Sequence, residues 1–295
     1  MRARLIAAAM LAVGVMTVPV VGSAIESSEG SDCAEPAPAA ATDCVAESAS
    51  PSDVSAQLHD RVGWAAEAAA TEAAASAGVL WRADHEEGDL SDWDRDDCGG
   101  QFDNGAAYTE FSNGTRNGSG GMRLRVPDMN TGNSEGARAF RWCESRQHQA
   151  LYYSAWYYIP EKVRVDGWWW LMEWKSEGSY NAKLGLAVAN RSDGAMYIGL
   201  GRGSDSGGGW WPQSVANLPV GRWFHLEVYY KKAADATGRV TVWQDGVRII
   251  DLAGVQTANS SDLGWAVINY GQYTRPADVE IYIDDVTIST QRPGP

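Results

Sequence analysis

The stretch that decides the fold reads WWWLMEWKSE and spans residues 168–177. Side chains alternate between two faces along a β-strand, so the stretch separates into two sets. The mostly apolar set is Trp170, Met172, Trp174 and Ser176; the mixed set is Trp169, Leu171, Glu173, Lys175 and Glu177. This predicts a strand with one face in a core and one polar face, which either contacts a ligand or forms a ladder of salt bridges in solvent.

Short alternating segments of the same kind lie on both sides of this strand. They cover residues 121–126, 138–144, 150–159, 183–189, 195–200, 223–230, 239–244, 265–270 and 279–289. Asn-Gly and Asp-Gly pairs, which suit tight hairpin turns, connect several of them. No long amphipathic helix pattern follows Gly78, which excludes βαβ folds. We therefore predict an all-β domain over residues 80–291.

The aromatic composition favours the same fold and indicates a ligand class. The chain has 14 Trp and 12 Tyr but only 4 Phe, together with 32 Gly. Aromatic strands joined by glycine turns are typical of β-sandwiches. Trp and Tyr also provide flat amphipathic surfaces, which favours sugar binding.

The N-terminal region predicts export. A basic start (Met-Arg-Ala-Arg) precedes an apolar run over residues 5–21 and the small residues Gly22-Ser23-Ala24. This is typical of a secretory signal peptide over residues 1–24, with a retained anchor as the alternative. Residues 25–79 are rich in Ala, Ser, Glu and Pro, which predicts a linker. We expect a secreted, extracellular protein with no membrane span in its mature form.

Charge and cysteine content limit the partners and the redox compartment. The net charge of −14 argues against nucleic acid. Much of it lies in residues 84–97, so a locally basic surface elsewhere is compatible with the sequence. Four cysteines in an exported chain favour disulfides. We predict Cys98–Cys143 inside the domain and Cys33–Cys44 in the linker, although other pairings stay open.

Six segments together resemble a known family. They are EEGDLSDW (86–93), YYSAWYYIP (152–160), WWWLMEWKSE (168–177), GRWFH (221–225), GRVTVWQDGVRIID (238–251) and IYIDDV (281–286). They are similar to the concanavalin A-like jelly roll of polysaccharide lyases of the heparin lyase I type. The resemblance implies a sandwich of two antiparallel sheets, with the polymer lying across the concave one. It also implies cleavage of a uronic-acid-containing polysaccharide by β-elimination.

β-Elimination needs a base for the C5 proton, an acid for the leaving oxygen and a group that neutralises the carboxylate. By position in the family pattern, Lys175 and Tyr270 are the candidate base and acid. Glu173 is a positioning group or a repulsive misfit for an acidic sugar. The family's Gln and His at this strand, and its Lys near the tyrosine, are missing.

The remaining candidates would bind the substrate. Arg138 and Arg141 suit a uronate carboxylate, since a guanidinium donates paired N–H groups. Trp169 would be a sugar platform. The other candidates are Glu177, Tyr273 and His148. Edge salt bridges and ordinary aromatic packing are the structural alternatives for the arginines and tyrosines, and His225 is expected to be structural.

Two other functions stay open. A non-catalytic, lectin-like module could use Trp168, Trp169, Trp210, Trp211, Tyr152 and Tyr158 as stacking surfaces. A laminarinase-like glycoside hydrolase could use Glu173 and Glu177, but Lys175 stands where that family has an Asp. A lysine there would keep both carboxylates ionised, whereas hydrolysis needs one protonated.

Structural calcium is a further expectation from the resemblance, because jelly rolls often bind Ca²⁺ between their first and last strands. The candidate ligands are Glu87, Asp89 and Asp285, with Glu86 and Asp284 as neighbours that could replace them. We expect no other cofactor, a polysaccharide as partner, and a monomer.

Overall fold

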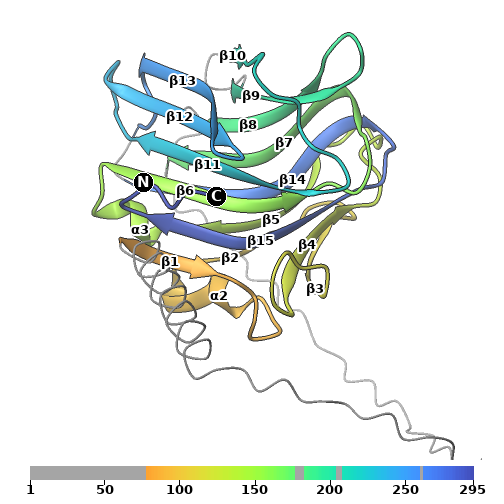
Figure 1. Ribbon diagram of the computed structural model, residues 1–295, viewed down its shortest axis with the longest axis horizontal. Helices are drawn as coiled ribbons and strands as arrows, with labels where there is room; N and C mark the ends of the chain where they lie inside the picture. Colours follow the sequence, from red (N-terminus) through yellow and green to blue (C-terminus); the bar gives the residue numbers. More distant parts are fainter. Residues whose placement is uncertain (1–77, 177–182, 204–207, 260–261) are drawn as a thin grey trace, which may run out of the picture. The chain divides into compact units, whose positions relative to one another are not determined.

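The computed structural model describes residues 78–176, 183–203, 208–259 and 262–295. Two antiparallel sheets form a sandwich (Figure 1), which confirms the predicted all-β fold. The predicted signal peptide, most of the predicted linker, and Cys33 and Cys44 lie outside the described residues. No helix in the described part is long and apolar enough to cross a membrane.

One sheet has eight strands. In spatial order they are β13 (Val247–Val255), β12 (Gly238–Gln244), β11 (Trp223–Lys231), β6 (Ala150–Tyr158), β15 (Val279–Ser289), β4 (Gly121–Val126) and β3 (Tyr108–Ser112), with β1 (Val79–Ala83) also paired to β15. The second sheet has seven: β10 (Gly209–Pro212), β9 (Met196–Arg202), β8 (Lys183–Asn190), β7 (Arg164–Ser176), β14 (Leu263–Arg275), β5 (Glu135–Arg141) and β2 (Gly99–Gln101). Short helices, α2 (Ser91–Asp94), η1 (Arg95–Asp97) and α3 (Cys143–Arg146), lie in the connections.

The core fills the space between the sheets because every second side chain of each strand points inward. On β8, Leu184, Leu186 and Val188 are buried, and on β9 Ile198 and Leu200 are fully buried. The intervening residues of the seven-stranded sheet therefore point away from the core. We call this outward surface the open face.

Strand β7 carries an irregularity that changes which side chains reach the open face. Trp170 lies opposite Ala187 of β8, whereas Met172 lies opposite the next residue, Leu186, so Leu171 is an extra residue. Leu171 and Met172 are both fully buried. Strict alternation therefore fails at this point, as expected at a β-bulge. The two predicted sets hold after the bulge, where Met172, Trp174 and Ser176 are buried and Glu173 and Lys175 are not. They are wrong for Trp169, Trp170 and Leu171, so Trp168 and Trp170 share the open face with Glu173 and Lys175.

Trp169 is consequently part of the core, and its predicted role as a sugar platform is wrong. Its side chain is fully buried, and its Nε1 donates to Oδ1 of Asn269 at 2.9 Å. The Asn269 amide donates in turn to the carbonyl oxygens of Leu124 at 3.0 Å and Val279 at 2.8 Å. Those carbonyls belong to β4 and β15, so a single buried amide joins the two sheets.

The Asn269→Ala variant is expected to lower the free energy of unfolding by about 2–4 kcal/mol, because it leaves one indole N–H and two carbonyls without their partner. Urea denaturation of the mature protein measures this. Asn133→Ala, at an exposed turn, is the control and should change stability by less than about 0.5 kcal/mol. Equal stability of the two variants would contradict the role of Asn269.

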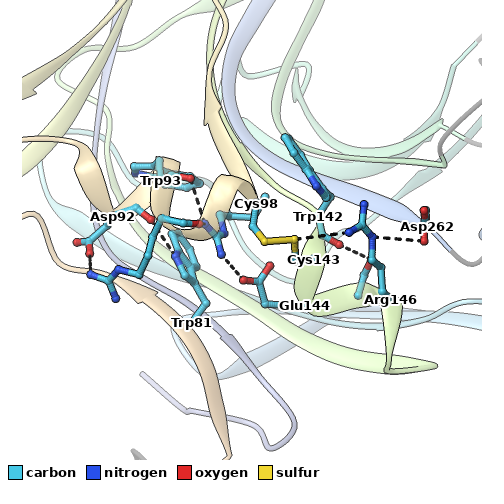
Figure 2. The surroundings of a disulfide bond; sticks show 12 residues. Trp81, Asp92, Trp93, Cys98, Trp142, Cys143, Glu144, Arg146 and Asp262 are labelled. Atoms are coloured by element: carbon cyan, nitrogen blue, oxygen red, sulfur yellow. Dashed lines mark hydrogen bonds and ion pairs between the residues drawn. A yellow bond between two sulfur atoms is a disulfide. The ribbon is translucent and has the colours of Figure 1, made fainter.

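The predicted disulfide between Cys98 and Cys143 is confirmed, and Figure 2 shows its surroundings. It joins the start of β2 to the first residue of α3, which follows β5, with Cα atoms 5.3 Å apart. The bond therefore closes the segment that contains β3, β4 and β5.

His225 lies on β11 in the eight-stranded sheet, where its side chain is buried and its ring stacks on Trp156 with centroids 4.8 Å apart. Burial lowers the pKa of His225 to about 3. The imidazole is therefore neutral, and its 3.9 Å contact with Glu227 is not an ion pair. The buried Glu227 carboxylate instead pairs with Arg292 at 2.7 Å. These contacts agree with the structural role expected for His225.

Candidate active site

Three neighbouring strands bring the site together on the open face. Arg138 of β5 lies opposite Ile268 of β14, two residues from Tyr270. Tyr270 lies between Gly136 of β5 and Trp170 of β7. The arginine, the tyrosine and the two half-buried tryptophans of β7, Trp168 and Trp170, thus occupy adjacent positions, although they are far apart in the sequence.

Arg138 is held beside Tyr270. Its guanidinium carbon lies 4.2 Å from the centroid of the Tyr270 ring and 5.3 Å from that of Phe102. Its Nη1 donates to Oδ1 of Asn104 at 2.7 Å. Burial lowers the pKa of Arg138, and negative charge on Tyr270 and Glu173 opposes that shift. A partly desolvated guanidinium of this kind binds a carboxylate strongly.

Tyr270 is packed from three sides. The Trp168 ring meets it edge to face, with centroids 4.7 Å apart. A Cβ at Gly136 would lie 2.6 Å from Cδ2 of Tyr270, so only glycine leaves room for the ring there. Together with Arg138, these contacts fix the direction of the phenol group. A hydroxyl fixed beside a cation is suited to proton transfer.

Glu173 and Lys175 continue along β7 on the same face. Glu173 lies opposite Ala266, and Lys175 lies opposite Gly264. Lys175 is five residues from Trp170, the residue opposite Tyr270. At about 3.3 Å per residue the separation along the strand is about 16 Å. An acid and a base that act on one bond must each come within about 3 Å of their proton, so this register does not favour Lys175 as the partner of Tyr270.

Other predicted substrate contacts lie elsewhere. Arg141 is 2% exposed and points to the opposite side of β5, where it donates to the carbonyls of Trp93 and Arg95 at 3.1 and 2.7 Å. Its predicted contact with a substrate carboxylate is therefore wrong. Glu144 forms an ion pair with Arg141. Figure 2 shows Trp93 and Glu144 next to the disulfide.

The structure does not bring Tyr273 and His148 into contact with Arg138. Tyr273 lies at an irregular position of β14, 44% exposed, with φ of 57°. His148 lines a separate surface pocket with Arg146 and Lys232. Glu177 lies outside the described residues.

The predicted calcium ligands are not assembled. Asp285 pairs with Arg82 and Arg116, each at 3.0 Å. Asp89 accepts from the backbone N–H of Ser91 at 2.8 Å. Among the described residues, no group of three or more His, Cys, Asp or Glu could hold a metal ion. Two arginines beside Asp285 oppose a cation there, so the donor set does not fit calcium.

Sequence reasoning does not single out Trp170, Phe102 or Asn104 as parts of this site. Strict alternation assigns Trp170 to the core, because the bulge at Leu171 is not visible in the residue pattern. Phe102 and Asn104 lie in the irregular segment after β2, which has no periodic signal. Phe102 is 57% exposed, and only the folded structure reveals this exposure.

The model of one family, described as polysaccharide lyase, matches residues 85–287. The chain belongs to this polysaccharide lyase family. The match covers nearly all of the sandwich, including Arg138 and Tyr270. The enzyme therefore cleaves a polysaccharide by β-elimination.

Solved structures similar to this polysaccharide lyase include the endo-β-1,4-glucuronan lyase of the fungus Trichoderma reesei, with 13% identity, a TM-score of 0.55, and coverage of 72% of this chain and 96% of that one. A mutant of the alginate lyase Aly36B with bound alginate trisaccharide has 14% identity and a TM-score of 0.51, covering 73% and 99%. The cellulose-induced protein Cip1 has 13% identity and a TM-score of 0.51, covering 72% and 99%. At these identities the likeness shows the fold alone. The comparison with curated protein sequences found no match.

Proposed function

We propose that this polysaccharide lyase is secreted and cleaves a uronic-acid-containing polymer, with Arg138 holding the uronate carboxylate and Tyr270 transferring the proton. The observation that carries the proposal is the guanidinium of Arg138 at 4.2 Å from the Tyr270 ring on the open face. Support comes from the glucuronan lyase and the alginate lyase of similar fold, whose polymers consist of uronic acids. The resemblance to the heparin lyase I type agrees with it, and residues 1–24 support secretion.

The reaction follows from two groups. Arg138 pairs with the C6 carboxylate and so stabilises the negative charge that develops when C5 loses its proton. Tyr270 Oη, in the deprotonated form that this step requires, takes the C5 proton. The C4–O4 bond then breaks, a double bond forms between C4 and C5, and Oη returns the proton to O4. Protons and electron pairs balance, and one residue serves as base and acid.

Glu173 and Lys175 act beside this centre. Glu173 lies opposite Ala266, which lies opposite Phe140, two residues from Arg138. Its negative charge opposes the lowering of the Arg138 pKa by burial, and we assign it the role of orienting the guanidinium. Lys175, about 16 Å along the strand from Trp170, would bind the carboxylate of a different sugar residue. In this proposal Tyr270 serves as both base and acid, and Lys175, which the sequence predicts as the base, takes no part in proton transfer.

A polymer panel tests the proposal. The mature protein is incubated with alginate, β-1,4-glucuronan, hyaluronan and deacylated gellan, and with laminarin as a control without uronate. We expect absorbance near about 235 nm, from the unsaturated uronate that elimination leaves, with at least one acidic polymer. New reducing ends without absorbance would indicate hydrolysis, and retention on a polymer without cleavage would indicate a binding module. Either result contradicts the proposal.

A further inference from the structure

The open face changes character between its two halves. On β5, β14 and β7 it carries Arg138, Glu173 and Lys175. Beyond Lys183, at the start of β8, the described open-face side chains of β8 and β9, and Trp210 of β10, are uncharged. They are Gly185, Ala187, Ala189, Tyr197, Gly199, Gly201 and Trp210. The one described cation beside them is Arg191, which follows β8 and lies 4.6 Å from the centroid of the Tyr197 ring. Its guanidinium donates to Oδ1 of Asn217 and to the carbonyls of Gln213 and Ala216, so its N–H groups are used within the protein.

Two indole rings lie against glycine residues of this uncharged half. A Cβ at Gly185 would lie 2.5 Å from Cε3 of Trp170, and a Cβ at Gly201 would lie 2.7 Å from Cη2 of the same ring. A Cβ at Gly199 would overlap Trp210. These approaches are too close for any side chain, so each ring rests on glycine. Trp210 is 41% exposed, and its ring meets that of Tyr197 with centroids 6.3 Å apart.

A flat indole suits the C–H face of an uncharged pyranose. Stacking buries apolar C–H groups and leaves the hydroxyls at the ring edge in water. A uronate in the same place would bring its carboxylate close to an apolar surface, and desolvation of an unpaired charge is costly. The described half-face from Gly185 to Trp210 therefore favours neutral sugars over uronates.

The neutral half begins directly beside the proposed catalytic pair. Trp170 lies opposite Tyr270, and its ring extends across β8 to β9. Neighbouring strands are about 4.8 Å apart, so Gly199 and Gly201 are about 14 Å from Tyr270 across the sheet. The sugars that stack on Trp170 and Trp210 are thus close neighbours of the uronate at Arg138 in the same polymer.

We propose that the substrate is a heteropolysaccharide in which the cleaved uronate is joined to uncharged sugars, and that Trp170 and Trp210 bind those sugars. The inference rests on the proposed function and names its substrate class. Arg138 selects the uronate, and the glycine-supported indoles select the neutral sugars next to it in the polymer.

The test compares four polymers. Hyaluronan and deacylated gellan contain uncharged sugars between their glucuronates, whereas alginate and β-1,4-glucuronan consist of uronates throughout. We expect kcat/KM for at least one mixed polymer to exceed that for both polyuronates by about 10-fold or more. Equal or faster elimination from a polyuronate would overturn this inference and leave the proposed function standing. The absence of unsaturated product from all four would overturn both.

A variant pair tests the stacking surface separately. Trp210→Ala should raise KM for the preferred mixed polymer by about 3- to 10-fold and change kcat little. Trp223→Ala is the matched control, because Trp223 is a partly exposed tryptophan in the other sheet. It should leave KM unchanged. Equal KM values for the two variants would overturn the role of Trp210.

Discussion

The Tyr270→Phe variant is expected to lose about 10²- to 10⁴-fold in kcat on a uronate polymer, the range for removal of a general acid or base. Phenylalanine keeps the ring that packs on Gly136 and meets Trp168, so the fold and the position of Arg138 should be retained. Only the hydroxyl that carries the proton is removed. KM should therefore change little, since the lost interaction acts in the transition state.

Tyr273→Phe is the matched control for this prediction. Tyr273, which the sequence offers as a substrate-binding residue, is a second tyrosine of β14 and is exposed at an irregular position of that strand. We expect its activity to stay within about twofold of the unmodified enzyme. Initial rates of absorbance increase measure both variants. A larger loss in Tyr273→Phe than in Tyr270→Phe would exchange their roles.

The Arg138→Ala variant should lose about 10²- to 10³-fold in kcat/KM, because the charge that develops at the uronate carboxylate loses its stabilising cation. Arg138→Lys should recover only part of this loss, since an ammonium cannot bind a carboxylate through two parallel N–H groups. The second cation on this face, Lys175, is too far along β7 to replace it.

Methyl esterification separates a role in chemistry from a role in structure. On the methyl ester of the same polymer the carboxylate charge is already absent, so the deficit of Arg138→Ala should shrink. Arg125→Ala is the control, because Arg125 lies on the eight-stranded sheet and pairs with Asp278 at 2.5 Å. Its kcat/KM should equal that of the unmodified enzyme on both substrates. An equal deficit on the acid and the ester would contradict pairing between Arg138 and the carboxylate of the bound substrate.

The strands and the disulfide were predictable because they depend on local patterns. Alternation of side chains identified most strands, and Cys98 with Cys143 was the economical pair. Arg138 and Tyr270 are candidates because of their place in the family pattern. The same alternation also places Arg138 and Arg141, three residues apart, on opposite faces of β5, so only one of them can lie on the open face.

The position of Trp169 could not be predicted in the same way. An extra residue at Leu171 exchanges the two faces of β7 beyond it, and nothing in the residue types marks that bulge. The glycines under Trp170 and Trp210 belong to β8 and β9, far from the rings in sequence. The contact between these glycines and the two rings depends on the order of the strands, which is a property of the whole sheet.

The covalent link at Cys98 has a practical consequence for anyone who measures the enzyme. The strand that carries Arg138 ends two residues before Cys143, and the edge strand beside it begins just after Cys98. Dithiothreitol, a routine addition to storage buffers, would release that edge while the rest of the sandwich stayed folded. Rates recorded with and without reductant should then differ even when the melting curve still shows a folded protein.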